Sequence, residues 1–98
     1  MAIGFVLQFS DVGIDGYNDV MRNLELESPG VTGVANQWPS GIISHVAGAT
    51  ENGWCVVDVW ESQARFDAFM QGRLGPAMGK AGLPEPVVTP FEVYNVHQ

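Results

Sequence analysis

Hydrophobic and polar positions alternate at the start of the chain and then change to a helical spacing. In residues 2–9 large apolar side chains alternate with smaller or polar ones, which predicts a strand whose strongly apolar face carries Ile3, Phe5, Leu7 and Phe9. Residues 15–26 instead place apolar side chains three and four positions apart, which predicts an amphipathic helix with Asp15 capping its first turn. The apolar positions of this helix are Tyr17, Val20, Met21 and Leu24.

A segment without periodicity follows the first predicted helix. Residues 28–40 contain two glycines, two prolines and two serines, so they cannot extend the helix and predict a long loop. Long loops in small domains often carry function. The alternative is a surface segment anchored by Trp38, and the sequence leaves both interpretations open.

Two apolar runs come next, residues 41–50 and residues 54–60. The intervening Asn52 and Gly53 form the dipeptide most typical of a tight β-hairpin. With an even-numbered turn, residues that pair across the hairpin have numbers that sum to an odd value. This register places four residues on one face, namely His45, Val56, Asp58 and Trp60.

The last third of the chain predicts a second helix and a final strand. Ser62 stands at the N-cap position of a helix with core positions Phe66, Phe69, Met70 and Leu74. Gly75 and Pro76 are expected to break this helix, with a short extra turn over residues 77–80. Residues 87–96 predict a strand, and Pro90 within it favours an edge or bulge position.

The order strand, helix, strand, strand, helix, strand predicts an α+β fold, the ferredoxin-like βαββαβ sandwich, as one domain over residues 1–98. Four antiparallel strands would carry both helices on one face. The third strand is apolar on both sides, with Val57 and Val59 opposite Val56 and Trp60. A sheet with two apolar faces needs a second cover, so we expect a homodimer formed through the sheet.

Composition and charge exclude several classes of partner. The 98 residues are 46% hydrophobic and carry a formal charge of -7, which would repel nucleic acid and anionic lipid surfaces. Without a long apolar run or a basic region ahead of one, we expect a cytosolic protein with no membrane association. The single cysteine, Cys55, cannot form an internal disulfide, and nothing near it suggests a zinc site.

Three segments carry a resemblance to a known superfamily: SHVAGATENGWCVVDVWES, FDAFMQGRLGPAMGKAGLP and FEVYNVH. They resemble the small dimeric α+β barrel proteins, which include the antibiotic-biosynthesis monooxygenases. The resemblance implies two ferredoxin-like protomers packed sheet against sheet, with a cavity beside each sheet. Its motifs are diagnostic of fold more than of chemistry, because members include oxygenases without a cofactor, haem-binding proteins and non-enzymatic proteins.

Haem-degrading members of that superfamily use an Asn on a strand with a Trp and a His on or near helices. The first strand here has no Asn, and neither predicted helix contains a His or a Trp. No phosphate loop, GxSxG, HExxH or EF-hand pattern is present either. We therefore expect no haem, flavin, metal or other cofactor.

The face shared by His45 and Asp58 is the best candidate site. An Asp beside a His can fix its tautomer and make the imidazole a general base near neutral pH, so these two residues are the candidate catalytic pair. Trp60 and Val56 on the same face, with Tyr94 near the C-terminus, are candidate contacts for a planar ligand. The alternative is that His45 and Asp58 satisfy each other at a dimer interface while Trp60 packs in the core.

Two functions stay open at this point. The first is a dimeric barrel protein that binds a small apolar or aromatic molecule, or that has no ligand. The second is a cofactor-independent monooxygenase on a planar aromatic or polyketide-like substrate, in which His45 removes a proton and the carbanion reacts with oxygen. Against the second, all four Lys and Arg residues lie on or after the predicted helices, where none is placed to stabilise an enolate.

Overall fold

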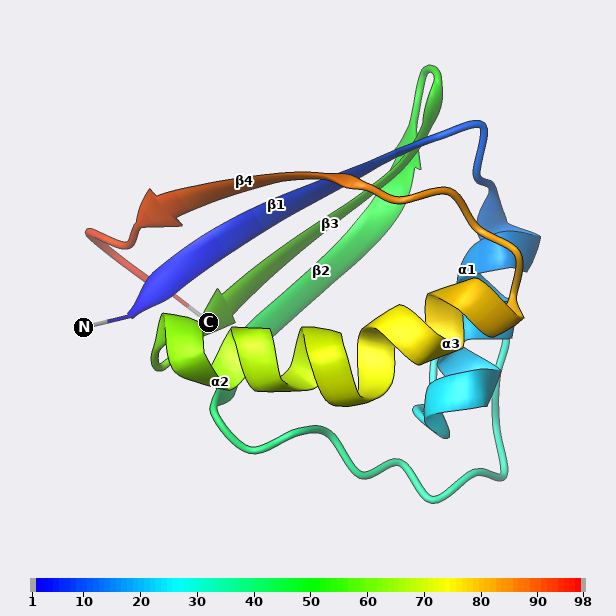
Figure 1. Ribbon diagram of the computed structural model, residues 1–98, viewed down its shortest axis with the longest axis horizontal. Coiled ribbons are helices and arrows are strands. Elements are labelled where there is room, and N and C mark those ends of the chain that lie inside the picture. The colour runs from blue at the N-terminus through cyan, green and yellow to red at the C-terminus, as the bar shows by residue number, and fades with distance from the viewer. Residues whose placement is uncertain (1, 98) are drawn as a thin grey trace.

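The computed structural model describes residues 2–97, which fold into one antiparallel sheet covered on one face by helices (Figure 1). The element order confirms the predicted ferredoxin-like βαββαβ fold. In chain order the elements are β1 (Ile3–Ser10), α1 (Ile14–Leu24), β2 (Ile42–Thr50), β3 (Gly53–Trp60), α2 (Gln63–Phe69), the π-helical turn η1 (Met70–Leu74), α3 (Gly75–Lys80) and β4 (Val87–Glu92).

The strands lie in the order β2-β3-β1-β4, so β4 is an edge strand. Pro90 pairs with Phe5 on this edge, where its missing N–H disrupts no inner ladder, and the edge prediction is confirmed. The strand is shorter than predicted, because it ends at Glu92 instead of residue 96. Tyr94 therefore lies beyond the sheet.

The first helix begins and ends differently from the prediction. It starts at Ile14 after the N-cap residue Gly13, which makes no side-chain cap bond. Asp15 is not the cap as predicted, since it lies inside the first turn, where a carboxylate favours the helix dipole instead. Glu25 ends the helix by adopting a left-handed backbone conformation with φ 57°.

The predicted break at Gly75 and Pro76 is wrong, because the helix continues from α2 through η1 into α3 (Figure 1). The Gly75 N–H donates to the carbonyl of Met70, five residues back, so the chain gains one π turn just before the proline. Pro76 then lies in the first turn of α3, where its missing N–H costs little. A Cβ at residue 75 would lie 2.9 Å from the Met70 carbonyl oxygen, which explains the glycine.

At the other end of this helix the predicted cap is present. The Ser62 hydroxyl oxygen accepts a hydrogen bond from the Arg65 backbone N–H at 3.3 Å. This satisfies one of the free amides of the first turn and starts α2 directly after β3.

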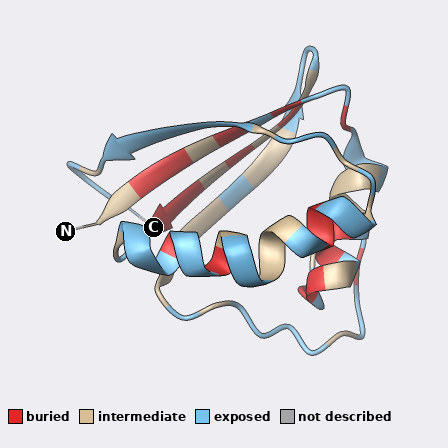
Figure 2. Cartoon of the chain, viewed as in Figure 1, coloured by how far each residue is buried: buried red, intermediate tan, exposed pale blue. Residues whose placement is uncertain are grey.

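The hairpin register agrees with the sequence prediction. His45 pairs with Asp58 and Ala47 pairs with Val56, while a bulge between Ile42 and Ser44 brings Ile42 opposite Trp60. These residues all face the helices. Figure 2 marks the buried positions in red, on the strands and on the helices that cover them. The core lies between these two layers, and its largest members are Phe5, Leu7, Phe9, Met21, Trp54, Trp60, Phe66 and Phe69.

The opposite face of the sheet is not covered by any helix of the described chain. None of its strand positions carries a charged side chain. Val46, Val87 and Phe91 are exposed there. The apolar positions of this open face are Val6, Val46, Cys55, Val57, Val59, Val87 and Phe91.

Candidate functional site

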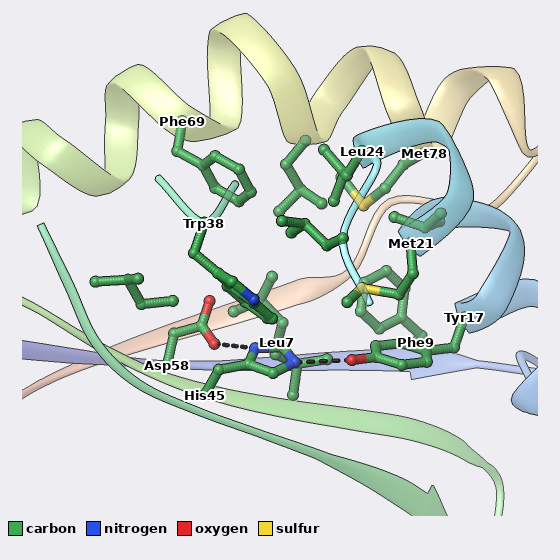
Figure 3. Close-up of a pocket in the computed structure, with 15 residues that line it drawn as sticks. Leu7, Phe9, Tyr17, Met21, Leu24, Trp38, His45, Asp58, Phe69 and Met78 are labelled. Carbon is green, nitrogen blue, oxygen red and sulfur yellow. Dashed lines mark hydrogen bonds and ion pairs between the residues drawn. The ribbon is translucent and has the colours of Figure 1, made fainter. Parts of the chain in front are cut away.

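Three side chains form a continuous hydrogen-bonded chain on the helix-covered face of the sheet (Figure 3). His45 Nδ1 lies 2.6 Å from Asp58 Oδ1, and His45 Nε2 lies 2.8 Å from the Tyr17 hydroxyl. A carboxylate can only accept and a neutral imidazole has one donor and one acceptor nitrogen, so in neutral His45 Nδ1–H donates to Asp58 and Nε2 accepts from the Tyr17 O–H. The hydrogen bonds thus select the imidazole tautomer whose Nε2 lone pair accepts from Tyr17.

Two separate parts of the fold bring these groups together. The β2–β3 register sets His45 directly opposite Asp58. Helix α1 crosses the same face and supplies Tyr17, whose ring packs against Trp54 at 5.2 Å between ring centroids. The sequence pattern identified Tyr17 as an apolar helix position, because helical spacing shows which residues face the sheet but not which strand residue each one meets.

The three groups of this hydrogen-bonded chain differ in burial, and burial affects the protonation of Tyr17. Asp58 is 4% exposed and is the only buried charged residue in the described chain, whereas the His45 side chain is 21% exposed. Burial, assisted by the negative charge of Asp58, raises the pKa of Tyr17 to about 12. Tyr17 therefore keeps its proton at neutral pH and acts as a hydrogen-bond donor to His45.

The chain borders a small apolar cavity of about 50 Å³ between the sheet and the helices. This volume is well below the roughly 300–1,000 Å³ of pockets that hold drug-sized ligands. Its polar wall consists of Tyr17, His45 and Asp58, and Figure 3 shows the remaining wall as apolar side chains from the strands and helices. Among them are Leu7, Phe9, Met21, Val56, Phe69 and Met78.

A wider cleft of about 300 Å³ lies on the other side of Tyr17 and His45. Asn18, Glu27 and Trp54 form part of its wall. A third hollow, of about 280 Å³, adjoins His45 from the start of β2. The imidazole can thus be reached from more than one direction.

The segment between α1 and β2 contributes to this site through Trp38. Its indole lies 5.0 Å from the His45 ring between ring centroids, tilted by 52°, and Figure 3 shows it between His45 and the helix that carries Phe69. The indole lines the small cavity and both neighbouring hollows. The sequence pattern singled out Trp38 as an anchor of a surface segment, but its place against His45 depends on how the loop crosses the sheet.

The structure brings only part of the predicted site together. His45, Asp58 and Val56 line the cavity. Trp60 shares their face but is 0% exposed and packs against Phe66 and Phe69, so it is a core residue beyond the cavity wall. Tyr94 is fully exposed beyond β4, and the structure does not bring it to the site.

The structure also bears on the alternative that His45 and Asp58 satisfy each other at a dimer interface. His45 and Asp58 face the helices of their own chain and not the open face of the sheet. A partner packed on the open face would therefore not contact them.

No Lys or Arg side chain of the described chain lines the cavity, although Arg73 lies over the Phe69 ring, 5.5 Å from its centroid. Arg22 pairs with Asp19 at 2.7 Å on the surface, Arg65 donates to Ser40, and Arg73 donates to backbone carbonyls. Over residues 2–97 no group of three or more His, Cys, Asp or Glu side chains is arranged to hold a metal ion. Within the same range no helix has the length and apolar character needed to cross a membrane.

Comparison with known proteins shows the fold. No family model and no curated protein matches the sequence. Among solved structures, a proposed antibiotic biosynthesis monooxygenase from Chloroflexus aurantiacus J-10-fl superposes with a TM-score of 0.66 at 10% identity, covering 100% of this chain and 98% of that chain. A mutant of SnoaB, a cofactor-independent oxygenase from Streptomyces nogalater, gives a TM-score of 0.65 at 16% identity, covering 97% and 95%.

A dimeric protein of unknown function and ferredoxin-like fold from Bacteroides fragilis NCTC 9343 gives a TM-score of 0.58 at 13% identity, covering 94% of this chain and 96% of that chain. These likenesses extend over nearly the whole chain and confirm the fold that the resemblance implied. Because all three identities are low, the chemistry of this chain has to be argued from its own side chains.

The first prediction concerns the stability of the His45–Asp58 pair. His45→Ala leaves the Asp58 carboxylate buried without its closest donor, so we expect a loss of about 2–3 kcal/mol in the free energy of unfolding. For a chain of this size the melting temperature should fall by about 10 °C or more. The double variant His45→Ala with Asp58→Asn should lose less than the sum of the two single losses, and additivity would contradict the coupling.

The second prediction concerns Tyr17 and alkaline pH. A raised pKa in the folded state means that the unfolded chain releases this proton first, near pH 10, while the folded chain holds it until about pH 12. The stabilising contribution is therefore complete below pH 10 and is lost as the pH rises toward 12. Melting curves followed by circular dichroism should show this decline in the wild type and a weaker one in Tyr17→Phe. An equal decline in both proteins would contradict the assignment.

Proposed function

We propose that this protein binds a small, flat molecule that is apolar apart from one acidic O–H or activated C–H group, and that His45 accepts the proton of that group. The observation that carries the proposal is the Asp58–His45–Tyr17 hydrogen-bonded chain in the wall of an otherwise apolar cavity. An apolar wall favours an apolar ligand, and the few polar groups determine its orientation.

The geometry supports a specific division of roles. His45 Nε2 carries the lone pair that receives the proton, and the Asp58 carboxylate at Nδ1 orients the ring and stabilises the imidazolium that forms. The Tyr17 hydroxyl, released from Nε2 by the ligand, can donate to the ligand anion instead. Two donors, Tyr17 O–H and the new Nε2–H, then face the anion and take the place of the cation that the sequence does not supply.

Oxygenation is the second candidate function, and the fold shared with SnoaB, a cofactor-independent oxygenase, favours it. A methylene between aromatic or carbonyl groups would lose one proton to His45, and the carbanion would combine with O₂ to give a hydroperoxide after protonation. Loss of water then leaves a carbonyl. The balance is R₂CH₂ + O₂ → R₂C=O + H₂O, in which the carbon is oxidised by four electrons and O₂ is reduced by four.

The third prediction tests this proposal with a matched pair of ligands. 2-Naphthol offers an acidic O–H, whereas 2-methoxynaphthalene has nearly the same shape and none. Titration calorimetry should show binding of 2-naphthol to the wild type about tenfold tighter than binding of the ether. In His45→Gln, which keeps a polar side chain, the preference should largely disappear.

Equal affinities for the two ligands, or a preference unchanged in His45→Gln, would contradict the proton-acceptor role. Anthrone separates the two functions, because its activated methylene is oxidised to a ketone with uptake of one O₂. Oxygen consumption and quinone absorbance that require His45 would support the oxygenase, and binding without oxygen uptake would support a binding protein.

We further infer that two copies of the chain associate through the open faces of their sheets. The strand positions of this face carry no charge, and they expose Val46, Val87 and Phe91 to solvent in the single chain. Exposed apolar surface of this kind favours burial against a partner. The neighbour from Bacteroides fragilis, which is dimeric, supports this assembly.

The fourth prediction is that light scattering after size exclusion gives twice the 10.6 kDa chain mass at micromolar concentration. Val46→Asp introduces a charge into the open face and should yield monomers, because an interface of about 1,000 Å² or more would have to desolvate it. Ile14→Asp is the matched control, since Ile14 is also exposed but lies on α1 beside the outer cleft. A monomeric wild type, or a dimer that Val46→Asp leaves intact, would contradict this arrangement.

A further inference from the structure

The cavity at His45, of about 50 Å³, is smaller than the ligand that its chemistry favours, and the Trp38 indole forms part of its wall. We propose that the Trp38 indole is a built-in occupant of the ligand site, which a flat aromatic ligand displaces to reach His45. This inference rests on the proposed function, since it concerns the same site. The inference adds to the proposed function a way for the ligand to enter the site and an expected ligand shape.

The first support is the position of the indole among the hollows. Trp38 and His45 are the two residues that line the small cavity, the outer cleft and the third hollow alike. Their volumes are about 50, 300 and 280 Å³. Moving the indole aside therefore joins spaces that are separate in this structure, and the joined space borders the His45 ring.

The second support is that the Trp38 indole makes a single side-chain hydrogen bond, so its outward rotation breaks only that one. Its Nε1–H donates to Asn36 Oδ1 at 3.1 Å, two residues away in the same loop. The side chain is also 37% exposed, which leaves room for it to rotate outward. A residue packed as a permanent core anchor would be buried more deeply.

The loop backbone around Trp38 is held on both sides. The Asn36 N–H donates to the Glu25 carbonyl at 2.8 Å, and the Glu61 N–H donates to the Gly41 carbonyl at 2.7 Å. These contacts fix the segment before and after the indole. Displacement is therefore a rotation of the Trp38 side chain about its own bonds, with the loop staying in place.

The shape of the displaced group indicates the shape of the ligand. The indole is a flat system of two fused rings whose centroid lies 5.0 Å from that of His45. A ligand with two fused aromatic rings replaces it ring for ring and restores the packing that its departure removes. A single ring leaves part of that space empty, so fused ring systems should bind better than phenol.

The fifth prediction follows from competition between indole and ligand. A ligand that must displace an occupant binds with an affinity reduced by the fraction of open protein. Trp38→Ala removes the occupant, so the dissociation constant of 2-naphthol should fall about tenfold or more. Trp38→Phe, with a smaller ring, should give an intermediate value, and phenol should gain less than 2-naphthol from the substitution.

Fluorine NMR tests the movement without depending on affinity. The chain has three tryptophans, so protein labelled with 5-fluorotryptophan gives signals for Trp38, Trp54 and Trp60, and Trp38→Phe assigns the first. We expect relaxation dispersion at Trp38 in the free protein, with the buried Trp54 and Trp60 as internal controls that show none. Addition of 2-naphthol should shift the Trp38 signal most.

The outcomes separate the two proposals. If 2-naphthol binds but Trp38→Ala leaves its affinity unchanged and the Trp38 signal stays in place, the displacement is overturned while the proposed function stands. If 2-naphthol binds neither the wild type nor Trp38→Ala, the proposed function fails. In that case dispersion at Trp38 in the free protein supports a movable occupant, and a static Trp38 signal overturns it.

Discussion

The site depends on a buried carboxylate in the middle of the helix-covered sheet face. Asp58 is 4% exposed, between Phe5 on β1 and His45 on β2, and moving an ion into such surroundings costs several kcal/mol unless donors meet it. The 2.6 Å hydrogen bond from His45 meets that need and at the same time orients the imidazole. The feature that would otherwise destabilise this core therefore also prepares a proton acceptor.

Because His45 Nδ1 is hydrogen-bonded to Asp58, the chemistry of the site depends on the group that faces Nε2. In this structure Tyr17 faces it, and burial raises the pKa of Tyr17 to about 12, so the phenol donates but does not transfer its proton. Proton transfer to Nε2 therefore requires a ligand hydroxyl or methylene that is acidic enough to protonate the imidazole, which the buried phenol is not. In the protein without ligand, Tyr17 therefore makes the hydrogen bond to Nε2 that such a ligand would make, but it does not transfer its proton.

Sequence reasoning was most successful where local pairing decides the structure. The Asn52-Gly53 signal predicts a hairpin with an even-numbered turn, and the odd sum of paired positions places His45 and Asp58 on one face. The structure confirms this register, with Glu51 and Asn52 as the two turn residues between Thr50 and Gly53. Sequence reasoning could not find Tyr17 or the role of Trp38, because both reach the site through packing between segments far apart in the chain. The sequence predicts a last strand that includes Tyr94, whereas β4 ends at Glu92. It also predicts a helix break at Pro76, because the π turn that lets the helix continue has no clear sequence signature.

The alternation of β3 keeps the two surfaces of the molecule independent. Cys55, Val57 and Val59 point to the open face, whereas the intervening Val56 and Asp58 point to the cavity. A slip of one residue would place the Asp58 charge on the uncharged face and a valine opposite His45, so the register that builds the site also keeps the open face apolar. Successive side chains of the eight-residue strand β3 point to opposite faces of the sheet. This alternation allows the proposed association to use one face while the proposed chemistry uses the other.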